Sequence, residues 1–525
     1  MHQVIRVFAS ASCALALSAC GGGGGGNGGT PTPIPAVVKP EQSWLTLTPA
    51  SADLMAYQDE PLTFKINVGS SKTFSKPFNV AIVDSVGVIS TNIKIDALSS
   101  TEYVATLQTS SVLTVGTHAT NLELRLCEDD AKVCKTPLEG SPWLIPLKVT
   151  VRSGTNLSTL RATPFMANWS TYQGNASHTG YVPASFDVNK FTRRWSLPAS
   201  TTTSELVPLV HDNGKVFGVF SGYFSPQSTL VAWSEDTGKE VWRVDLGSVH
   251  RANPAAAANG KVYLATSGHE NTFFWVFDQA TGQLQSKKSM SSQWPSYLAP
   301  TVYGDTVYTN SGYYGGMSKF STVTNDLLWA TTALPQYDGW TPAVDGAYAY
   351  TFIGGSMYAV NVGDGNVAYK IQDVDNSWSG YTGTVPVLSG KQSAFIVSGG
   401  RLIAFDLAAK TRLWSANGTA VGQPVFAKEV LYTLNAGGTV LEAHSPSTGA
   451  MLWTSNSLKS GEHFSKLLVT DNLAFLSSEN VTLAISLASK QVVWEYPFGG
   501  DLSISNRGVL YISGKNRKIA AVNLE

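Results

Sequence analysis

The chain has 525 residues, more than the roughly 250–300 at which a single hydrophobic core stops growing, so we expect two or more domains. Charged residues make up only 14% of the sequence and apolar residues 43%, and the 48 glycines favour a β-rich protein with many turns. The formal net charge of −1 and the lack of any basic run argue against nucleic acid as a partner.

The first 19 residues have the pattern of an export signal. Arg6 supplies a positive charge, and residues 7–17 form an apolar stretch that is too short to cross a membrane as a stable helix. Small residues then lead into Cys20 in the sequence LSAC. This segment resembles the signal of bacterial lipoproteins, which implies a signal peptide over residues 1–19 and a lipid such as palmitate on Cys20. The alternative is an ordinary secretory signal with an incidental cysteine.

Residues 20–42 form a predicted tether. The stretch after Cys20 reads GGGGGGNGGTPTPIPAVVKP, in which polyglycine is a flexible coil and the proline-rich part is stiffer. Enteric lipoproteins that stay in the inner membrane carry Asp directly after the lipidated cysteine, and this chain has Gly21 there. The resemblance therefore implies a protein anchored in the outer membrane. The sequence leaves open whether it faces the periplasm or the cell surface.

Residues 43–152 read as short alternating strands separated by turn residues, the pattern of a small antiparallel β-sandwich. The segment LRLCEDDAKVCKTPLEGSPWLIPLKVTV resembles Ig-like modules of bacterial surface lipoproteins. It contains Cys127 and Cys134 on either side of an acidic turn, and we predict that they form a disulfide at a hairpin tip. No second pair of Cys or His has the spacing of zinc ligands nearby, so we expect no metal site.

After a linker at residues 153–167, the rest of the chain, residues 168–525, repeats. A turn with the pattern EDTGKEVW ends in an aromatic residue, and this position recurs at intervals of 39 to 45 residues, with Ser286 in place of the aromatic residue in one repeat. Repeats of this length made of short strands are typical of β-propeller blades with four strands each. We predict that the aromatic residues dock each blade on its neighbour, at Trp242, Trp329, Tyr369, Trp414, Trp453 and Trp494.

The two ends of the propeller are expected to form one blade together. The last segment, GVLYISGKNRKIAAVNLE, has inner strands but no final tryptophan strand, whereas FTRRWSLP near the start has an orphan docking residue, Trp195. If residues 191–197 complete the C-terminal blade, the total is seven plus one, or eight blades. Such closure limits the number of exposed strand edges.

The repeats resemble those of the PQQ-like, or quinoprotein dehydrogenase-like, β-propeller family, and NWSTYQGNASHTGYVP resembles the usual lead-in of that family. The resemblance covers residues 168–525 and implies one of two branches. One branch consists of enzymes that hold pyrroloquinoline quinone and calcium in the central channel. The other consists of non-catalytic scaffolds, among them BamB, a lipoprotein of the outer-membrane protein assembly machinery. The fold alone does not choose between the two branches.

The residues favour the non-catalytic branch. The propeller has none of the adjacent cysteines that quinoprotein alcohol dehydrogenases commonly place against the cofactor, although the sugar-oxidising branch also lacks them. No cluster of acidic residues suggests a calcium site with a general base, and the HExxH and GxSxG motifs are absent. We therefore predict no enzyme activity, no catalytic residue and no cofactor.

The loops that lead into the inner strands of three consecutive predicted blades are aromatic, and the preceding blade has polar residues at the matching place. Because such loops share one face of a propeller and surround its channel, they form a candidate binding rim for a peptide or a sugar. The alternative is that the rings only pack over the channel or against the sandwich. The predicted rim consists of His250, Arg251, Asn253, Trp294, Tyr297, Tyr337, Trp340, Trp378 and Tyr381.

Three functions follow as hypotheses. The first is an outer-membrane scaffold that binds envelope proteins, as in outer-membrane protein assembly; the sandwich and the long tether, which BamB lacks, argue against direct membership in that machinery. The second is a surface-displayed lipoprotein that binds a glycan or a protein of another cell. The third, with the least support, is a quinone-dependent dehydrogenase.

Overall fold

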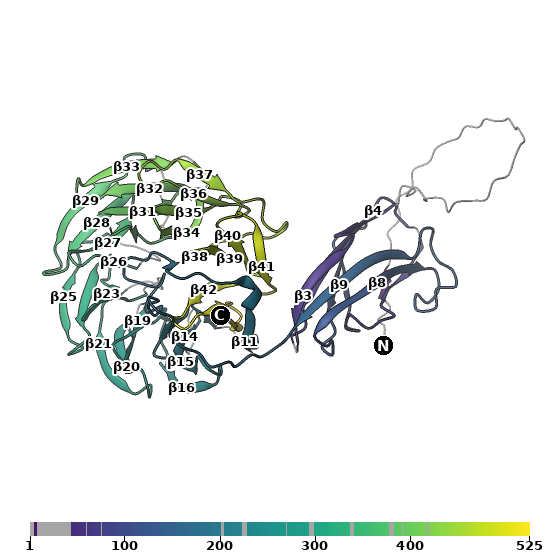
Figure 1. Cartoon of the computed structure of the whole chain (residues 1–525), viewed down its shortest axis with the longest axis horizontal. Coiled ribbons are helices and arrows are strands. Elements are labelled where there is room, and N and C mark those ends of the chain that lie inside the picture. Colours follow the sequence, from purple (N-terminus) through teal and green to yellow (C-terminus); the bar gives the residue numbers. More distant parts are fainter. Residues whose placement is uncertain are drawn as a thin grey trace, which may run out of the picture. The chain divides into compact units, whose positions relative to one another are not determined.

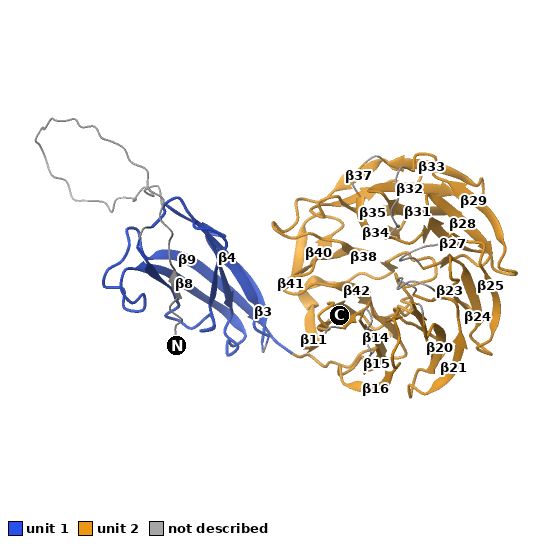
Figure 2. Cartoon of the chain, turned by 180° about the vertical axis from the view of Figure 1, so that it is seen from behind, with its two compact units in different colours: residues 1–154 blue, residues 155–525 orange. Residues whose placement is uncertain are grey.

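The computed structural model describes residues 5–7, 44–58, 60–74, 76–200, 204–222, 228–268, 270–292, 299–335, 341–376, 383–390, 392–416, 418 and 420–525. These residues divide into two compact units, Met1–Gly154 and Thr155–Glu525 (Figure 2), and the prediction of an all-β protein is confirmed. The helix that the described residues contain is a short 3-10 turn, η1 (Val188–Lys190), and none of them forms a helix long and apolar enough to cross a membrane. Cys20 and the predicted tether lie outside the described residues.

The first unit is a sandwich of two β-sheets. One sheet has the strand order β1-β5-β8-β9-β3 and the other has the order β2-β4-β7-β6. Neighbouring strands are antiparallel, except that β3 and β9 run parallel. The bounds are β1 (Ile5–Val7), β2 (Leu45–Thr48), β3 (Ala52–Tyr57), β4 (Thr63–Ser70), β5 (Phe78–Val83), β6 (Lys94–Ala97), β7 (Glu102–Gln108), β8 (Gly116–Cys127) and β9 (Trp143–Arg152).

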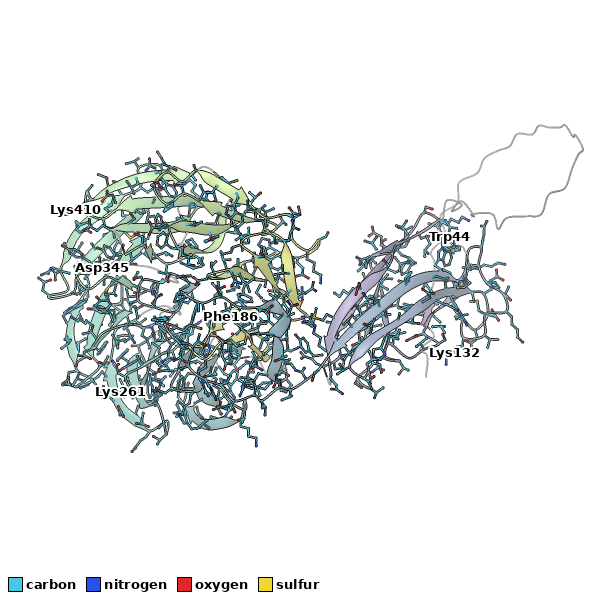
Figure 3. The ribbon with its side chains drawn as sticks, viewed as in Figure 1. Trp44, Lys132, Phe186, Lys261, Asp345 and Lys410 are labelled. Carbon is cyan, nitrogen blue, oxygen red and sulfur yellow. A yellow bond between two sulfur atoms is a disulfide. The ribbon has the colours of Figure 1, made fainter. Side chains whose placement is uncertain are left out.

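One hydrophobic core lies between these sheets, because side chains alternate between the inner and outer faces of the strands. In β9, every second residue from Ile145 to Val151 is buried. Trp44 (Figure 3) packs edge-on against Trp143 with ring centroids 5.0 Å apart. A disulfide joins Cys127, at the end of β8, to Cys134. β1 falls within the predicted signal peptide and pairs with β5.

The second unit is a β-propeller (Figure 1). Its described strands form eight sheets arranged in a ring, and each sheet runs from an inner to an outer strand. We call each sheet a blade. From inner to outer, the strands are β12 (Glu205–Leu206), β13 (Val210–Asp212), β14 (Lys215–Ser221), β15 (Thr229–Ser234) and β16 (Glu240–Asp245); β17 (Arg251–Ala252), β18 (Ala256–Ala258), β19 (Lys261–Ser267), β20 (Phe273–Asp278) and β21 (Leu284–Ser289); β22 (Thr301–Tyr303), β23 (Thr306–Asn310), β24 (Met317–Ser321) and β25 (Leu327–Thr331); β26 (Ala343–Val344), β27 (Tyr348–Ile353), β28 (Ser356–Asn361) and β29 (Val367–Gln372); β30 (Val387–Leu388), β31 (Ser393–Ser398), β32 (Arg401–Asp406) and β33 (Thr411–Ala416); β34 (Ala420–Ala427), β35 (Val430–Asn435), β36 (Leu441–His444) and β37 (Met451–Thr454); β10 (Tyr181–Val182), β38 (Lys466–Thr470), β39 (Leu473–Ser477), β40 (Thr482–Ser486) and β41 (Val492–Tyr496); β42 (Asp501–Ile504), β43 (Val509–Ser513), β44 (Ile519–Asn523) and β11 (Thr192–Leu197).

We name the blades by the strands β14, β19, β23, β27, β31, β35, β39 and β43, each of which follows the inner strand of its blade in the chain. In two blades the inner strand is split, since β12 and β13 both pair with β14, and β17 and β18 both pair with β19. β10 is an additional short strand beside the inner strand β38.

The turns of the blades gather at the two ends of the ring, because the consecutive strands of each blade are antiparallel. At one end, which we call the mouth face, lie the connections into each inner strand and the turns between second and third strands. At the other end, the plug face, lie the turns between first and second strands and between third and outer strands. The two faces therefore present different sets of loops.

Aromatic residues of the outer strands dock on the following blade. The indole Nε1 of Trp242 donates a hydrogen bond to the carbonyl of Gln279 at 3.1 Å, and a Cβ on Gly282 would lie 2.7 Å from the indole ring. The indole therefore packs directly on the glycine of the neighbouring turn. The same bond to a turn carbonyl is made by Trp195, Trp329, Tyr369 and Trp414.

Three of the predicted docking positions are held differently. The ring of Trp453 meets Tyr432 of its own blade edge-on, with centroids 5.9 Å apart, and Nζ of Lys490, in a turn of the following blade, lies 5.4 Å from the centroid of the indole.

Beside Ser286, Lys261 (Figure 3) reaches the next blade, and its Nζ donates to the carbonyl of Thr322 at 2.5 Å. Trp494 has no described hydrogen-bond partner for its Nε1, because the turn that it would meet is interrupted by the start and the end of the propeller chain. Its ring instead packs edge-on against Phe191, with centroids 5.4 Å apart.

Residues 168–184, which we call the plug segment, lie at the centre of the ring. Their backbone carbonyls accept hydrogen bonds from the inner strands or their flanks in six blades, and the hydroxyl of Thr171 donates to Pro300 just before β22. The plug segment thereby supplies acceptors for amides of the inner strands that face the channel, and in one blade it does so as strand β10, which pairs parallel with β38. The acceptor carbonyls are those of Trp169, Ser170, Ala176, Ser177, Thr179, Gly180 and Ala184, and the donor amides are those of His211, Ala257, Val344, Leu388, Phe426, Val469 and Asp471, the last two of which belong to one blade.

His178 of the plug segment is fully buried between two blades. Its Nδ1 donates to the carbonyl of Pro386 at 3.2 Å, and its Nε2 accepts from the hydroxyl of Thr301 at 3.2 Å, which is the pattern of a neutral imidazole. Burial lowers the pKa of His178 to about 3. Burial also lowers the pKa of His211, which stacks on Tyr511 with centroids 4.3 Å apart, to about 3.

The ring closes between β11 and β44, which pair antiparallel. Arg194 of β11 is 1% exposed, and its guanidinium donates to the carbonyls of Ser158, Glu235 and Asp236 at 2.8–3.1 Å. It also donates to Oδ1 of Asn523 in β44 at 3.1 Å. One buried side chain thus joins both ends of the propeller to the β14 blade.

Replacing Arg194 with Ala is expected to lower the free energy of unfolding by about 3 kcal/mol, because several buried acceptors lose their donor. Urea unfolding followed by tryptophan fluorescence measures this change. Arg243→Ala is the matched control, since its ion pair with Glu240 is solvent-exposed and is worth less than about 1 kcal/mol. Equal losses in both variants would show that closure does not depend on Arg194.

The two buried histidines make the stability of the propeller pH-dependent. Their folded pKa of about 3 lies below the unfolded value of 6.5, so only the unfolded chain binds these protons between those values. The free energy of unfolding should therefore fall as the pH drops below about 6.5, by about 2 kcal/mol per histidine at pH 5. Urea unfolding at pH 7, 6 and 5 tests this; His178→Asn should flatten the profile, and an unchanged slope would contradict the assignment.

Candidate functional site

A cavity of about 230 Å³ lies at the centre of the ring. Each inner strand runs from the mouth face to the plug face. Where an inner strand bonds to the plug segment, its residues that line the cavity come earlier in the chain than the residue that makes this bond. The cavity therefore lies between the plug segment and the mouth face. The plug segment forms the floor with Trp169, Tyr172 and Gln173. The walls come from six blades and consist of Pro208, Leu209, Val210, Pro254, Ala255, Gly383, Gly422, Gln423, Ser465, Lys466, Leu467, Asp501 and Leu502.

Lys466 and Asp501, which we call the polar pair, carry the charge in this wall. They begin β38 and β42, and Nζ of Lys466 lies 2.6 Å from Oδ1 of Asp501. The side chain of Lys466 is 46% exposed and that of Asp501 is 19% exposed. The Asp501 carboxylate raises the pKa of Lys466, so the ammonium stays protonated. Burial raises the pKa of the nearby Tyr172 hydroxyl, which therefore stays neutral.

A second cavity of about 450 Å³ adjoins the first one and shares Ser465 and the polar pair with it. Its other residues belong to connections and turns at the mouth face, so we call it the mouth cavity. Most of these residues have hydroxyl, amide or charged side chains, or are glycines. They are Ser478, Glu479, Asn480, Phe498, Gly499, Gly500, Ser513, Gly514, Lys515 and Asn516.

The central cavity does not fit a quinone held by calcium. Calcium takes six to eight oxygen ligands, mostly from carboxylates and carbonyls. Among the described lining residues Asp501 is the one carboxylate, and it is already paired with Lys466. The side chain of Gln423 is used in a two-way bond with the backbone of Val385. No group of three or more His, Cys, Asp or Glu in the described part of the chain could hold a metal ion.

The structure describes three of the predicted rim residues. His250 is partly buried, and its Cβ lies 2.2 Å from where a Cβ on Gly268 would be. Arg251 belongs to β17 and pairs with Ser267. Asn253 is fully buried, and its Nδ2 donates to the carbonyl of Ala265 at 2.9 Å. The six aromatic rim residues, Trp294, Tyr297, Tyr337, Trp340, Trp378 and Tyr381, lie outside the described residues.

Tyr313 and Tyr314, which were not part of the predicted rim, form an exposed aromatic turn between β23 and β24 at the mouth face. Their side chains are 47% and 71% exposed, and their rings meet edge-on with centroids 4.8 Å apart. A Cβ on Gly315 would lie 2.1 Å from the carbonyl oxygen of Pro335, so only glycine fits there. The signal in the sequence was the pair of tyrosines between glycines, SGYYGG.

The tyrosine turn is held by the residues that lead into two of the predicted rim loops. The amide of Gly312 donates to the carbonyl of Ser291 at 2.6 Å, and Gly312 forms a bridge with Ser292. On the other side, Gly315 packs against the backbone of Pro335. The two rings are therefore presented by a backbone that is fixed from both sides.

Comparison with protein families gives one match. The family model described as "Outer membrane protein assembly factor BamB" matches residues 178–285 and 270–496, which together are more than half of the chain. Comparison with curated protein sequences gives no match.

Several solved structures are similar in fold. Quinohemoprotein alcohol dehydrogenase from Comamonas testosteroni has a TM-score of 0.51 and 13% identity, over 70% of this chain and 81% of that chain. Quinohemoprotein alcohol dehydrogenase ADHIIG from Pseudomonas putida HK5 has a TM-score of 0.50 and 12% identity, over 68% of this chain and 80% of that chain. BamB from Moraxella catarrhalis has a TM-score of 0.48 and 13% identity, over 64% of this chain and 98% of that chain.

At these identities the structural likeness to the two dehydrogenases shows the fold alone, and it confirms the predicted β-propeller. The match that covers more than half of the sequence goes further than the fold. The chain belongs to the PQQ-like β-propeller family whose model is described as outer membrane protein assembly factor BamB.

Proposed function

We propose that this protein is a non-catalytic scaffold of the bacterial envelope, anchored in the outer membrane by a lipid on Cys20, and that it binds another protein with the mouth face of its propeller. The observation that carries this proposal is the exposed tyrosine turn. It presents two aromatic rings to solvent on a fixed backbone.

Such a turn suits a protein partner for energetic reasons. Tyrosine is enriched among the few residues that supply most of the binding energy at protein interfaces. A tyrosine ring offers a large contact area with few rotatable bonds, and a fixed backbone reduces the entropy lost on binding. The hydroxyl groups of Tyr313 and Tyr314 add hydrogen-bonding capacity at the edge of that contact.

Three features support an envelope location. The family description refers to an assembly factor of outer membrane proteins. The sequence LSAC ending at Cys20 matches a lipoprotein signal. The disulfide between Cys127 and Cys134 is of the kind that persists in oxidising compartments such as the periplasm.

The central cavity supports a role without quinone chemistry, because its described residues do not form a calcium-binding set. The scaffold role requires only that the mouth face be rigid and accessible. The plug segment contributes rigidity by bonding to six blades.

Replacing Tyr313 and Tyr314 together with Ser is expected to reduce capture of the partner at least tenfold, because the aromatic contact area is lost. Crosslinking of the full-length lipoprotein in native membranes, followed by affinity purification and quantitative mass spectrometry, measures the capture. Phe165→Ser is the matched control, since it removes a ring that is 95% exposed but lies before the plug segment. Specific envelope proteins captured equally by the tyrosine variant would place the contact elsewhere, and recovery of no specific protein by the wild type would contradict the scaffold function.

A further inference from the structure

We propose that the central cavity and the mouth cavity form one binding site for the end of a neutral carbohydrate chain, in which Lys466 and Asp501 bond to neighbouring hydroxyl groups of the sugar. This site is separate from the tyrosine turn, and the proposal does not rest on the scaffold function.

The charges around the site favour a neutral ligand. In the described lining of the central cavity, Lys466 and Asp501 are the charged residues, and they balance each other. The mouth cavity adds Glu479 and Lys515, which again sum to zero. A charged ligand would leave one charge without a partner in a partly enclosed space, whereas a neutral ligand keeps every charge compensated.

The hydrogen-bonding groups suit hydroxyls. The ammonium of Lys466 only donates and the carboxylate of Asp501 only accepts, whereas a hydroxyl does both. Two neighbouring sugar hydroxyls can therefore accept from Nζ and donate to the carboxylate at the same time, because the two protein atoms lie only 2.6 Å apart. Ser465, Ser513 and Asn516 line the adjoining space and add donors and acceptors, whereas the hydroxyl of Ser478 and the amide of Asn480 are bonded to Glu462.

The floor of the central cavity adds an apolar surface. Trp169 and Tyr172 of the plug segment line it, and the C–H face of a sugar ring can pack on such rings. The volumes of about 230 Å³ and 450 Å³ together fall in the range of roughly 300–1,000 Å³ that is typical of small-molecule sites. Because the plug segment closes the other end of the channel, a long glycan can enter only with one end.

A peptide fits this site less well than a sugar. Extended peptides bind mainly by adding a strand to a sheet edge with free backbone groups. The backbone amides of His211, Ala257 and Val469 in the inner strands are already bonded to carbonyls of the plug segment. Ser465, Lys466 and Asp501, which line both cavities, have side chains that match hydroxyl groups.

The test is isothermal titration calorimetry of the full chain with neutral sugars: methyl glucoside, methyl galactoside, methyl mannoside, cellobiose, maltose and N,N′-diacetylchitobiose. At least one of them is expected to bind with a Kd of about 1 mM or tighter. Asp501→Asn and Lys466→Met should each weaken that binding at least tenfold. The matched control is Lys428→Met, because Lys428 forms a similar ion pair with Asp471 (2.7 Å) that lines neither cavity, and it should leave binding unchanged.

Charged analogues and a peptide complete the test. Glucuronate and glucosamine, which carry one negative and one positive charge, should bind at least tenfold more weakly than the neutral sugar. The proposal is overturned if no neutral sugar binds, if a charged analogue or the capped peptide acetyl-Gly-Ser-Gly-amide binds as tightly, or if Asp501→Asn binds like the wild type. Ser465→Ala, which removes a hydroxyl that lines both cavities and is expected to weaken binding by a smaller factor, replaces either charge variant if that variant does not fold as judged by circular dichroism.

Discussion

The propeller depends on how the backbone groups at its centre are paired. Inner strands that face a channel leave amides with no neighbouring strand, and a buried amide without a partner costs free energy comparable to a lost hydrogen bond. The plug segment supplies the missing acceptors with seven backbone carbonyls. Because these acceptors belong to one continuous stretch of chain, residues 168–184, they tie the blades to one another as well as to the plug.

The same stretch determines the character of the channel. With His178 neutral and fully buried, the plug segment brings no ionised histidine into the centre of the ring. It also fills the channel on the plug side of the central cavity, whose described lining continues into the mouth cavity. A short distance further along the chain, β11 completes the last blade, and Arg194 bonds that blade to its neighbour. Residues 168–197 therefore fill the ring and close it.

The repeats could be predicted from the sequence because the features of each blade are close together in the chain. Trp242 and the turn that precedes it are neighbours in the sequence, and the same pair recurs every 39 to 45 residues, so the pattern can be recognised by comparing repeats without knowing how the blades contact one another. The sequence also showed that Ser286 stands where the other repeats have an aromatic residue. It did not show the contact of Lys261 with Thr322 that links these two blades, because a lysine at the start of a strand is usually a surface residue.

The candidate site could not be predicted in the same way. The lead-in motif was recognised, but its role depends on backbone bonds to strands from 42 to 289 residues away, such as those of His211 and Val469. Lys466 and Asp501 belong to different repeats, and no pattern within one repeat indicates that they meet. Tyr313 and Tyr314 did carry a signal in their flanking glycines, but the aromatic loops nearby in the sequence were the stronger pattern.

The two proposed surfaces lie on different blades of one face. The tyrosine turn belongs to the β23 blade, whereas the mouth cavity lies between the β39 and β43 blades, across the ring from it (Figure 1). A protein bound at the tyrosine turn can therefore leave the mouth cavity open, and a glycan end can occupy the cavity without displacing that protein. Each blade also packs on its neighbours through the docking residues, so the two surfaces are connected around the ring as well as through the plug segment. It is their separation across the ring, and not an absence of connecting contacts, that allows both surfaces to be occupied at once.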